Sequence, residues 1–188
     1  HGIDGPVVGV AFDGTGYGTD GTAWGGEFFL GDATAVSRVA TFRPIDLAGG
    51  DAAIRQPWRT ALALLVDTFG DAAPLDLIPL FERVTRAQLE GVREMLDARL
   101  NTPRARGVGR FFDAFGAIVL ARPAARYEGQ VAFELNMAAD PDERATYAYG
   151  VTTPGSLIEI DLRPTAHAVV DDLLSGVRSS IIAARFHN

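Results

Sequence analysis

The sequence predicts one α+β unit, in which an antiparallel meander sheet packs with several helices. Two patterns support this prediction. Twelve of the 21 glycines fall in the first 50 residues, around short strand-like runs. The rest of the chain carries apolar residues at steps of three or four, as amphipathic helices do. With 188 residues, the chain can enclose the core of one domain.

Three apolar runs near the start are expected to form the meander. They cover residues 7–12, 23–30 and 36–42, and Gly, Pro or Asp residues that favour turns separate them. The first run should end at a glycine-rich turn. Two later runs, 147–151 and 157–162, flank Thr-Thr-Pro-Gly-Ser and predict a hairpin.

Helical periodicity predicts two helices in the middle of the chain. Residues 52–69 form the first, and Asp51 is a natural N-cap for it. Residues 85–100 form the second. Gln88 stands three residues after Thr85, the spacing of a capping box.

Three more helices are expected in the second half. Residues 108–120 should stop before Pro123, and 129–139 before Pro141. The last helix, 165–186, is opened by Pro164 and carries one continuous apolar stripe.

The residues that are absent limit the chemistry. The chain has no cysteine and no lysine, since all 17 basic residues are arginine. This excludes a thiolate nucleophile, a zinc–thiolate site, a Schiff base and a phosphate-loop lysine. His1, His167 and His187 lack the spacing of paired metal ligands. We expect no complete metal site in this chain, and His167 should lie on the surface.

Charge and hydropathy exclude two classes of partner. The net charge is -7 and the isoelectric point is about 4.9, which disfavours binding to nucleic acid. The apolar runs are far shorter than the roughly 20 residues that cross a bilayer. We therefore expect a cytoplasmic protein with neither a nucleic-acid nor a membrane partner.

The richest local motif is Asp13-Gly14-Thr15-Gly16-Tyr17-Gly18, followed by Trp24-Gly25-Gly26-Glu27. Successive N–H groups in such a turn are able to cradle a phosphate without lysine. Asp13 would add an oxygen ligand for a divalent cation. The same residues also fit a hairpin in which Asp13 caps its own turn, and the pattern does not choose between the two.

Two further glycine motifs also have two interpretations. Gly49-Gly50-Asp51 offers a helix start to an anion, although taken alone the motif favours an aspartate cap. In the segment from Gly107 to Asp113, Gly109 permits close approach of a ligand or of another backbone. Arg110 and Asp113 share a helix face there and predict a surface ion pair. Three aromatic residues are expected in the core: Trp24, Trp58 and Phe111.

Taken together, these motifs resemble the HypF family, the carbamoyltransferases of nickel–iron hydrogenase maturation. The resemblance also includes the block 49–59 and Tyr127-Glu128-Gly129-Gln130, and it follows the family's order along nearly the whole chain. It implies that residues 1–188 are part of the C-terminal domain of such an enzyme, truncated at both ends. That domain shares its fold with the tRNA threonylcarbamoyl transferases (TsaD) and, more distantly, with actin-like ATPases.

The resemblance also implies an activity. Family members make carbamoyl-adenylate from carbamoyl phosphate and ATP, and pass the carbamoyl group to the C-terminal cysteine of a partner, HypE. Such chemistry needs no cysteine or lysine from this chain. By similarity, the phosphate would lie beside residues 14–16 and the ribose beside Gly109 and Asp113. The candidate nucleotide-binding residues are Gly14, Thr15, Gly16, Gly49, Gly50, Asp51, Gly109 and Asp113.

A divalent metal (Mg, Fe or Zn) is implied as well. Its family ligands are a histidine pair, an aspartate that matches Asp13, and a later aspartate. The histidine motif would precede His1 and the later segment would follow Asn188, so the site is expected to be incomplete here. Glu128 and Gly129 belong to a family signature for which the sequence suggests no physical role.

Two other functions remain open. In the first, the chain serves only to dock HypE or the rest of its own polypeptide. In the second, it belongs to an antibiotic O-carbamoyltransferase, in which the acceptor is a hydroxyl group. The block 49–59 favours the HypF family over the latter. By itself the chain is expected to be catalytically poor.

Overall fold

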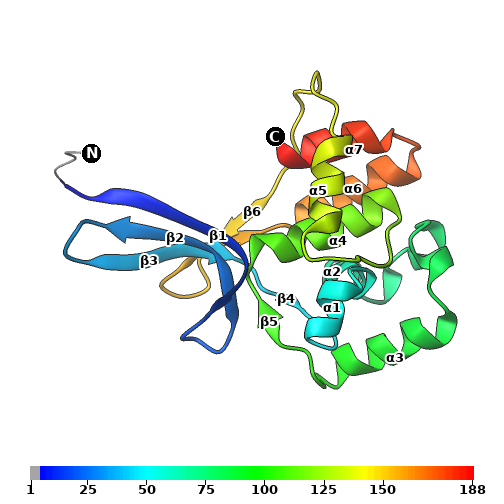
Figure 1. Cartoon of the computed structure of the whole chain (residues 1–188), viewed down its shortest axis with the longest axis horizontal. Coiled ribbons are helices and arrows are strands. Elements are labelled where there is room, and N and C mark those ends of the chain that lie inside the picture. Colours follow the sequence, from blue (N-terminus) through cyan, green and yellow to red (C-terminus); the bar gives the residue numbers. More distant parts are fainter. Residues whose placement is uncertain (1–4) are drawn as a thin grey trace.

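The computed structural model describes residues 5–188, and in it a projecting sheet joins a cluster of helices (Figure 1). The strands β1 (Val7–Tyr17), β2 (Ala23–Gly31) and β3 (Val36–Phe42) form the predicted antiparallel meander. In Figure 1 this meander extends away from the helices, and most residues of β1 are exposed. The predicted α+β fold is confirmed.

Four short strands complete the sheet. The predicted hairpin is present as β6 (Gly150–Thr152) and β7 (Ile158–Asp161). Two strands of two residues each, β4 (Ile45–Asp46) and β5 (Arg104–Ala105), are too short to give a periodic signal and were not expected. Because β5 runs parallel to β2 and β7 runs parallel to β3, the sheet is mixed and not purely antiparallel.

The first strand is longer than the sequence predicts. Phe12 pairs with Gly26 and Gly16 pairs with Trp24, so residues 13–15 of β1 face only Gly25 of β2. We call residues 13–15 the β1 bulge. The expected turn after residue 12 is therefore a bulge inside a continuing strand, because pairing with β2 resumes beyond it.

The expected helix 52–69 is two helices, α1 (Asp51–Arg55) and α2 (Trp58–Phe69). Pro57 separates them because it has no N–H to donate and restricts the residue before it. The predicted cap at Asp51 is also wrong. Gly50, with φ of 57°, is the N-cap, and Asp51 is the first helical residue without a capping hydrogen bond among the described residues.

The three central helices agree with the sequence. They are α3 (Arg86–Asp97), α4 (Val108–Leu120) and α5 (Gln130–Ala138). Thr85 and Gln88 form the predicted capping box at the start of α3. Before α3, three short 3₁₀ turns connect the chain, at Gly70–Ala72, Leu75–Leu77 and Phe81–Arg83.

The expected last helix is also divided, into α6 (Arg163–Leu174) and α7 (Ser179–His187). Gly176 has φ of 77° and donates its N–H to the Leu173 carbonyl, while Val177 donates to Asp172. These two bonds form a Schellman motif, which ends a helix. The predicted stripe is therefore not carried by one helix, because the chain leaves the helical conformation between Leu174 and Ser179.

The core lies among the helices. It centres on α2 and α4, and its fully buried side chains include Leu62, Leu65, Phe115, Ile118, Val169 and Ile182. Trp58 and Phe111 belong to it as predicted. Trp24 does not, because its ring is only partly buried and lies under the Arg38 guanidinium, 4.0 Å from the ring centre. Within residues 5–188, no helix is long and apolar enough to span a membrane.

Candidate functional site

The β1 bulge depends on glycine in the strand opposite. Gly25 has φ of 139°, and a Cβ there would lie 2.7 Å from the Asp13 carbonyl oxygen. The N–H groups of Gly25 and Gly26 both donate to Oε2 of the buried Glu27, at 2.6 and 2.7 Å. The strand thus ties its own backbone to a side-chain carboxylate, which holds the bulge in place.

The bulge rests on the N-terminus of α4. A Cβ at Gly107 would overlap the Gly14 carbonyl oxygen, and one at Gly109 would lie 2.9 Å from Gly14 Cα. Only glycine at these two positions permits the contact. The first N–H groups of a helix have no partner within the helix and attract negative charge. Gly14 and Gly109, predicted from separate motifs, are therefore brought together next to a helix start.

Asp13 uses its carboxylate locally. Its Oδ1 accepts the N–H of Gly14 at 2.6 Å, and the side chain is exposed. Thr15 is exposed at the end of the bulge, whereas Gly16 is back in the strand pairing, opposite Trp24. The Gly14 N–H, one of the donors of the predicted phosphate site, is therefore already hydrogen-bonded to the carboxylate of Asp13.

A buried charge cluster lies beneath the bulge. Arg110 is 2% exposed, and its Nη2 lies 2.9 Å from Oδ2 of Asp113, which is 3% exposed. The same nitrogen is 3.8 Å from Oε1 of Glu128. Arg110 Nε and Nη1 have no hydrogen-bond partner among the described residues. The predicted Arg110–Asp113 pair thus exists, but it is buried and not at the surface, because the bulge and α5 cover the start of α4.

Burial changes the protonation of this cluster. Loss of solvent raises the pKa of Asp113 to about 6, although the positive charge of Arg110 opposes the shift, and the nearby negative charge of Glu128 adds to it. The carboxyl group of Asp113 therefore holds its proton to higher pH than an ordinary aspartate does.

A second polar cluster links β2 and β3 with the turn that precedes β2. Arg38 donates to Asp20 at 2.7 Å and to Oε1 of Glu27 at 3.2 Å, and Thr41 shares that oxygen. Burial raises the pKa of Asp20, but hydrogen bonds from Thr22, Arg38 and Trp24 outweigh it and hold the value well below its usual range. This cluster was not predicted, and its one signal in the sequence is the acidic Glu27 inside the apolar run 23–30.

An open cavity lies beside the bulge. Its volume is about 470 Å³, which is in the range of small-molecule sites. Asp13 and Gly109 line it on one side, and Phe133 and Asn136 of α5 line it on the other. The remaining lining residues are mostly apolar: Phe12, Val108, Phe112, Ala132 and His187. The cavity thus connects two predicted site residues with an aromatic wall.

The Gly49-Gly50-Asp51 turn has other contacts. The Gly49 N–H donates to the Asn101 carbonyl, and the atom nearest to a Cβ at Gly49 belongs to Arg59. The helix it opens, α1, has only five residues. The structure therefore brings this turn against Asn101 and Arg59 and not into contact with the bulge, and a nucleotide role for Gly49, Gly50 and Asp51 stays a prediction.

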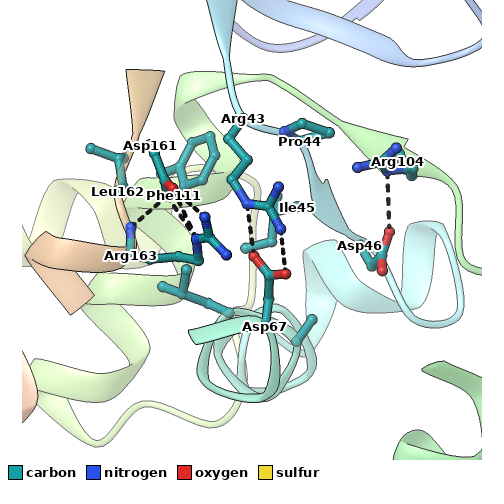
Figure 2. A pocket seen from close by; sticks show the side chains of 12 residues that line it. Arg43, Pro44, Ile45, Asp46, Asp67, Arg104, Phe111, Asp161, Leu162 and Arg163 are labelled. Atoms are coloured by element: carbon teal, nitrogen blue, oxygen red, sulfur yellow. Dashed lines mark hydrogen bonds and ion pairs between the residues drawn. The ribbon is translucent and has the colours of Figure 1, made fainter. Parts of the chain in front are cut away.

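Figure 2 shows a second, smaller pocket of about 50 Å³. Arginine–aspartate pairs dominate it: Arg43–Asp67 at 2.5 Å, Arg163–Asp161 at 2.6 Å and Arg104–Asp46 at 3.8 Å. Burial raises the pKa of Asp46. Each of these three arginines already has a carboxylate partner. The pocket is therefore lined by ion pairs that join different elements, and it is not an anion site.

The residues present do not form a metal site by themselves. Over residues 5–188, no three His, Cys, Asp or Glu side chains are grouped so that they could hold an ion. His167 is exposed and packs its ring on Phe69, and His187 contacts Phe112. His1 lies outside the described residues. Within this part of the chain, Asp13 thus belongs to no group of three such ligands.

Comparison with known proteins identifies the architecture. The family profile described as "Carbamoyltransferase, Kae1-like Domain, second subdomain" matches residues 9–188. Carbamoyltransferase HypF2 of Cupriavidus necator is 41% identical over 140 residues, which cover 74% of this chain and 17% of that protein. Carbamoyltransferase HypF of Synechocystis sp. is 31% identical across the whole chain, which corresponds to 26% of its length.

Two solved structures have the same fold. One is full-length HypF in its phosphate- and nucleotide-bound form, with a TM-score of 0.87 and 33% identity over 99% of this chain and 24% of that one. The other is HypF of T. kodakarensis, with a TM-score of 0.77 and 26% identity over 96% of this chain and 24% of that one. The strand meander and the helices described above are thus shared with much longer proteins.

Proposed function

Because the chain belongs to the HypF carbamoyltransferase family, we propose that it forms the wall of a carbamoyl-transfer site that holds the phosphate of a nucleotide. The chain spans 17% and 26% of the length of the two relatives named above. The complete activity is therefore proposed for a polypeptide that includes this chain, and the part proposed for the chain itself is binding and orientation.

The proposed reaction uses carbamoyl phosphate, water and ATP to form carbamoyl-adenylate, and it releases inorganic phosphate from carbamoyl phosphate and pyrophosphate from ATP. In the transfer step, the thiolate of the C-terminal cysteine of HypE attacks the carbamoyl carbon. The new carbon–sulfur bond forms, the bond from that carbon to the phosphate oxygen breaks, and AMP leaves. Since the reactive groups come from the adenylate and from HypE, the chain needs no nucleophile of its own. It contributes by positioning the adenylate and limiting access of water.

One observation carries this proposal: the β1 bulge lies directly against the N-terminus of α4. Backbone N–H groups of a glycine-rich bulge and of a helix start together attract phosphate, as they do in other nucleotide sites. The Gly14 N–H already binds a carboxylate oxygen of Asp13, which occupies the place of an anion. The similar full-length HypF structure was solved with phosphate and nucleotide bound, which supports the same ligand class here.

A divalent metal would need ligands from outside this chain. Among the described residues, no three His, Cys, Asp or Glu side chains are grouped to hold an ion, and Asp13 is the candidate ligand at the bulge. We therefore propose Asp13 as the contribution of this chain to such a site, and derive no reaction step from the metal.

Calorimetric titration with ATP and MgCl₂ tests the proposal. We expect heat of binding for the wild-type chain and weaker binding for Gly109→Ala, whose Cβ would push the bulge away from α4. Gly155→Ala is the control, because within the described part of the chain nothing lies within 4 Å of its Cβ position. Absence of heat at millimolar ATP with the wild-type chain would contradict the proposal.

A docking role is the second candidate, and one observation favours it. The meander exposes large apolar side chains on β1: Val7, Val8, Val10, Phe12 and Tyr17. A lobe that only docks HypE or other parts of its own polypeptide would use such a surface and give no heat with ATP. The same titration therefore separates the two candidates.

A further inference from the structure

Glu27 is a buried carboxylate directly beside the β1 bulge. It is 2% exposed and lies on β2, two residues after Gly25, the residue that faces the bulge. Its Oε2 accepts the N–H groups of Gly25 and Gly26 at 2.6 and 2.7 Å. Because each N–H carries one hydrogen, both donors are withdrawn from ladder pairing with β1 at the place where the register shifts. The carboxylate is therefore one physical reason why residues 13–15 bulge.

A second carboxylate holds the position at which the bulge ends. Asp20 accepts the indole N–H of Trp24 at 2.9 Å, and Trp24 pairs with Gly16, where the ladder resumes. Asp20 also accepts the backbone N–H and the hydroxyl group of Thr22. The turn between β1 and β2 is thus fixed relative to the end of the bulge.

Arg38 of β3 joins the two carboxylates. Its Nη1 donates to Asp20 at 2.7 Å, and its Nη2 donates to Oε1 of Glu27 at 3.2 Å. Thr41 donates its hydroxyl group to the same Oε1 at 3.2 Å. The Arg38 side chain is only 10% exposed, so salt screens these ion pairs weakly. We call Asp20, Arg38 and Glu27 the clamp, because one guanidinium connects the groups that hold the two ends of the bulge.

We propose that Glu27 is the positioning residue of the phosphate wall, and that the clamp fixes the bulge in its ligand-binding shape before a nucleotide arrives. The proposal rests on the proposed function, since it assumes that phosphate binds at the bulge. Phosphate binding by backbone N–H groups depends on where those groups point, and a preset arrangement avoids the cost of ordering them. The positive charge of Arg38 offsets part of the negative charge of Glu27, which limits repulsion of the phosphate.

Calorimetry with ATP and MgCl₂ compares the wild-type 188-residue chain with Glu27→Gln. The amide keeps the shape of the side chain but accepts the two glycine N–H groups more weakly than a carboxylate does. We expect ATP to bind about tenfold less tightly, the effect of one hydrogen bond to a charged group. In NMR spectra of the nucleotide-free variant, the amide protons of Gly25 and Gly26 should move upfield, and the amide signals of Gly14 and Thr15 should shift with them.

Asp161→Asn is the matched control. Asp161 is another buried strand carboxylate paired with an arginine, since it is 7% exposed and accepts the backbone N–H and the guanidinium of Arg163. It lines the pocket of Figure 2 and not the cavity beside the bulge. Both variants should lower the melting temperature, because each removes charge from a buried ion pair. Only Glu27→Gln should weaken ATP binding, measured where circular dichroism shows every variant folded.

The outcomes separate this inference from the proposed function. If Glu27→Gln binds ATP as tightly as the wild type, or if Asp161→Asn weakens ATP binding equally, the positioning role is wrong and the phosphate wall stands. If Glu27→Gln does not fold, Thr41→Val replaces it, because this variant removes one donor to the same carboxylate. Its affinity for ATP should fall about threefold, and an unchanged affinity would overturn the inference. If the wild-type chain binds no ATP, the proposed function and this inference both fail.

Discussion

At the scale of single residues, the site depends on positions where a side chain cannot fit. The backbone of Gly14 occupies the space that a Cβ of Gly107 would need, while Gly91, inside α3, has nothing within 4 Å of its Cβ position in the described chain. The same substitution should therefore have opposite effects at these two glycines. Helix propensity favours alanine at residue 91, and steric overlap opposes it at residue 107.

We expect Gly107→Ala to lower the free energy of unfolding by roughly 1–3 kcal/mol, the usual cost of overpacking. Gly91→Ala should raise it by about 0.5–1 kcal/mol, because alanine is favoured inside a helix. Urea denaturation followed by circular dichroism measures both values. Equal stability of Gly107→Ala and the wild type would show that the bulge does not lie against α4.

Asp113 gives a prediction about pH. Burial raises its pKa from 3.8 to about 6 in the folded chain. Between these values the folded state holds a proton that the unfolded state has lost, so this group stabilises the fold most below pH ~4 and loses that effect as the pH rises to ~6. Asp113→Asn removes this contribution.

The measurement is the free energy of unfolding of both proteins at several pH values. From pH ~4 to ~6, the wild type should lose stability relative to Asp113→Asn, and the difference should be constant above that range. A difference that stays the same from pH ~4 upward would mean that the carboxyl group of Asp113 has its ordinary pKa.

At the site, the sequence was most informative about glycine, because the main structural use of glycine is to allow close approach. The sequence predicted close approach of a ligand or of another backbone at Gly109, and in the structure the backbone of Gly14 lies there. It could not predict that Gly107 and Gly25 share this contact, since nothing in one sequence says which glycines meet. Charge partners across elements were also out of reach. Glu128 meets Arg110 only because α5 folds back over the start of α4.

At the scale of elements, the sequence predicted features that depend on local signals better than those that depend on long-range contacts. Caps and periodicity located α3 and α4, and Thr85 and Gln88 form the expected capping box. The two divided helices were missed because their apolar periodicity continues across the break. Pro57 and Gly176 were the signals that should have outweighed it, since one lacks an N–H and the other readily adopts positive φ.

Asp51 at the start of α1 and Thr85 at the start of α3 give a contrasting pair of variants. Thr85→Ala should cost about 1 kcal/mol of stability, because Thr85 accepts the N–H of Gln88 as an N-cap. Asp51→Ala should change stability by less than about 0.5 kcal/mol, because Asp51 is exposed and caps nothing in the described structure. Thermal denaturation of both variants is the measurement. A larger loss for Asp51→Ala would restore the capping role that the sequence alone predicts.

At the scale of the whole molecule, the sheet and the helices have different tasks. The helices enclose the core around α2 and α4, while the meander projects from it with apolar side chains exposed (Figure 1). The bulge lies where these two parts meet, against the start of α4. Composition and periodicity predicted both parts, but the mixed sheet order depends on two-residue strands that pair with distant partners.

The central claim is that a nucleotide binds where the bulge meets α4. Titration of ¹⁵N-labelled chain with ATP and MgCl₂, followed by two-dimensional NMR of the backbone amides, tests this location directly. The account predicts that the largest shifts occur at the amides of Gly14, Thr15 and Gly109, with smaller ones along the start of α5. Shifts confined to the arginine–aspartate pocket of Figure 2, or none at saturating ATP, would contradict it.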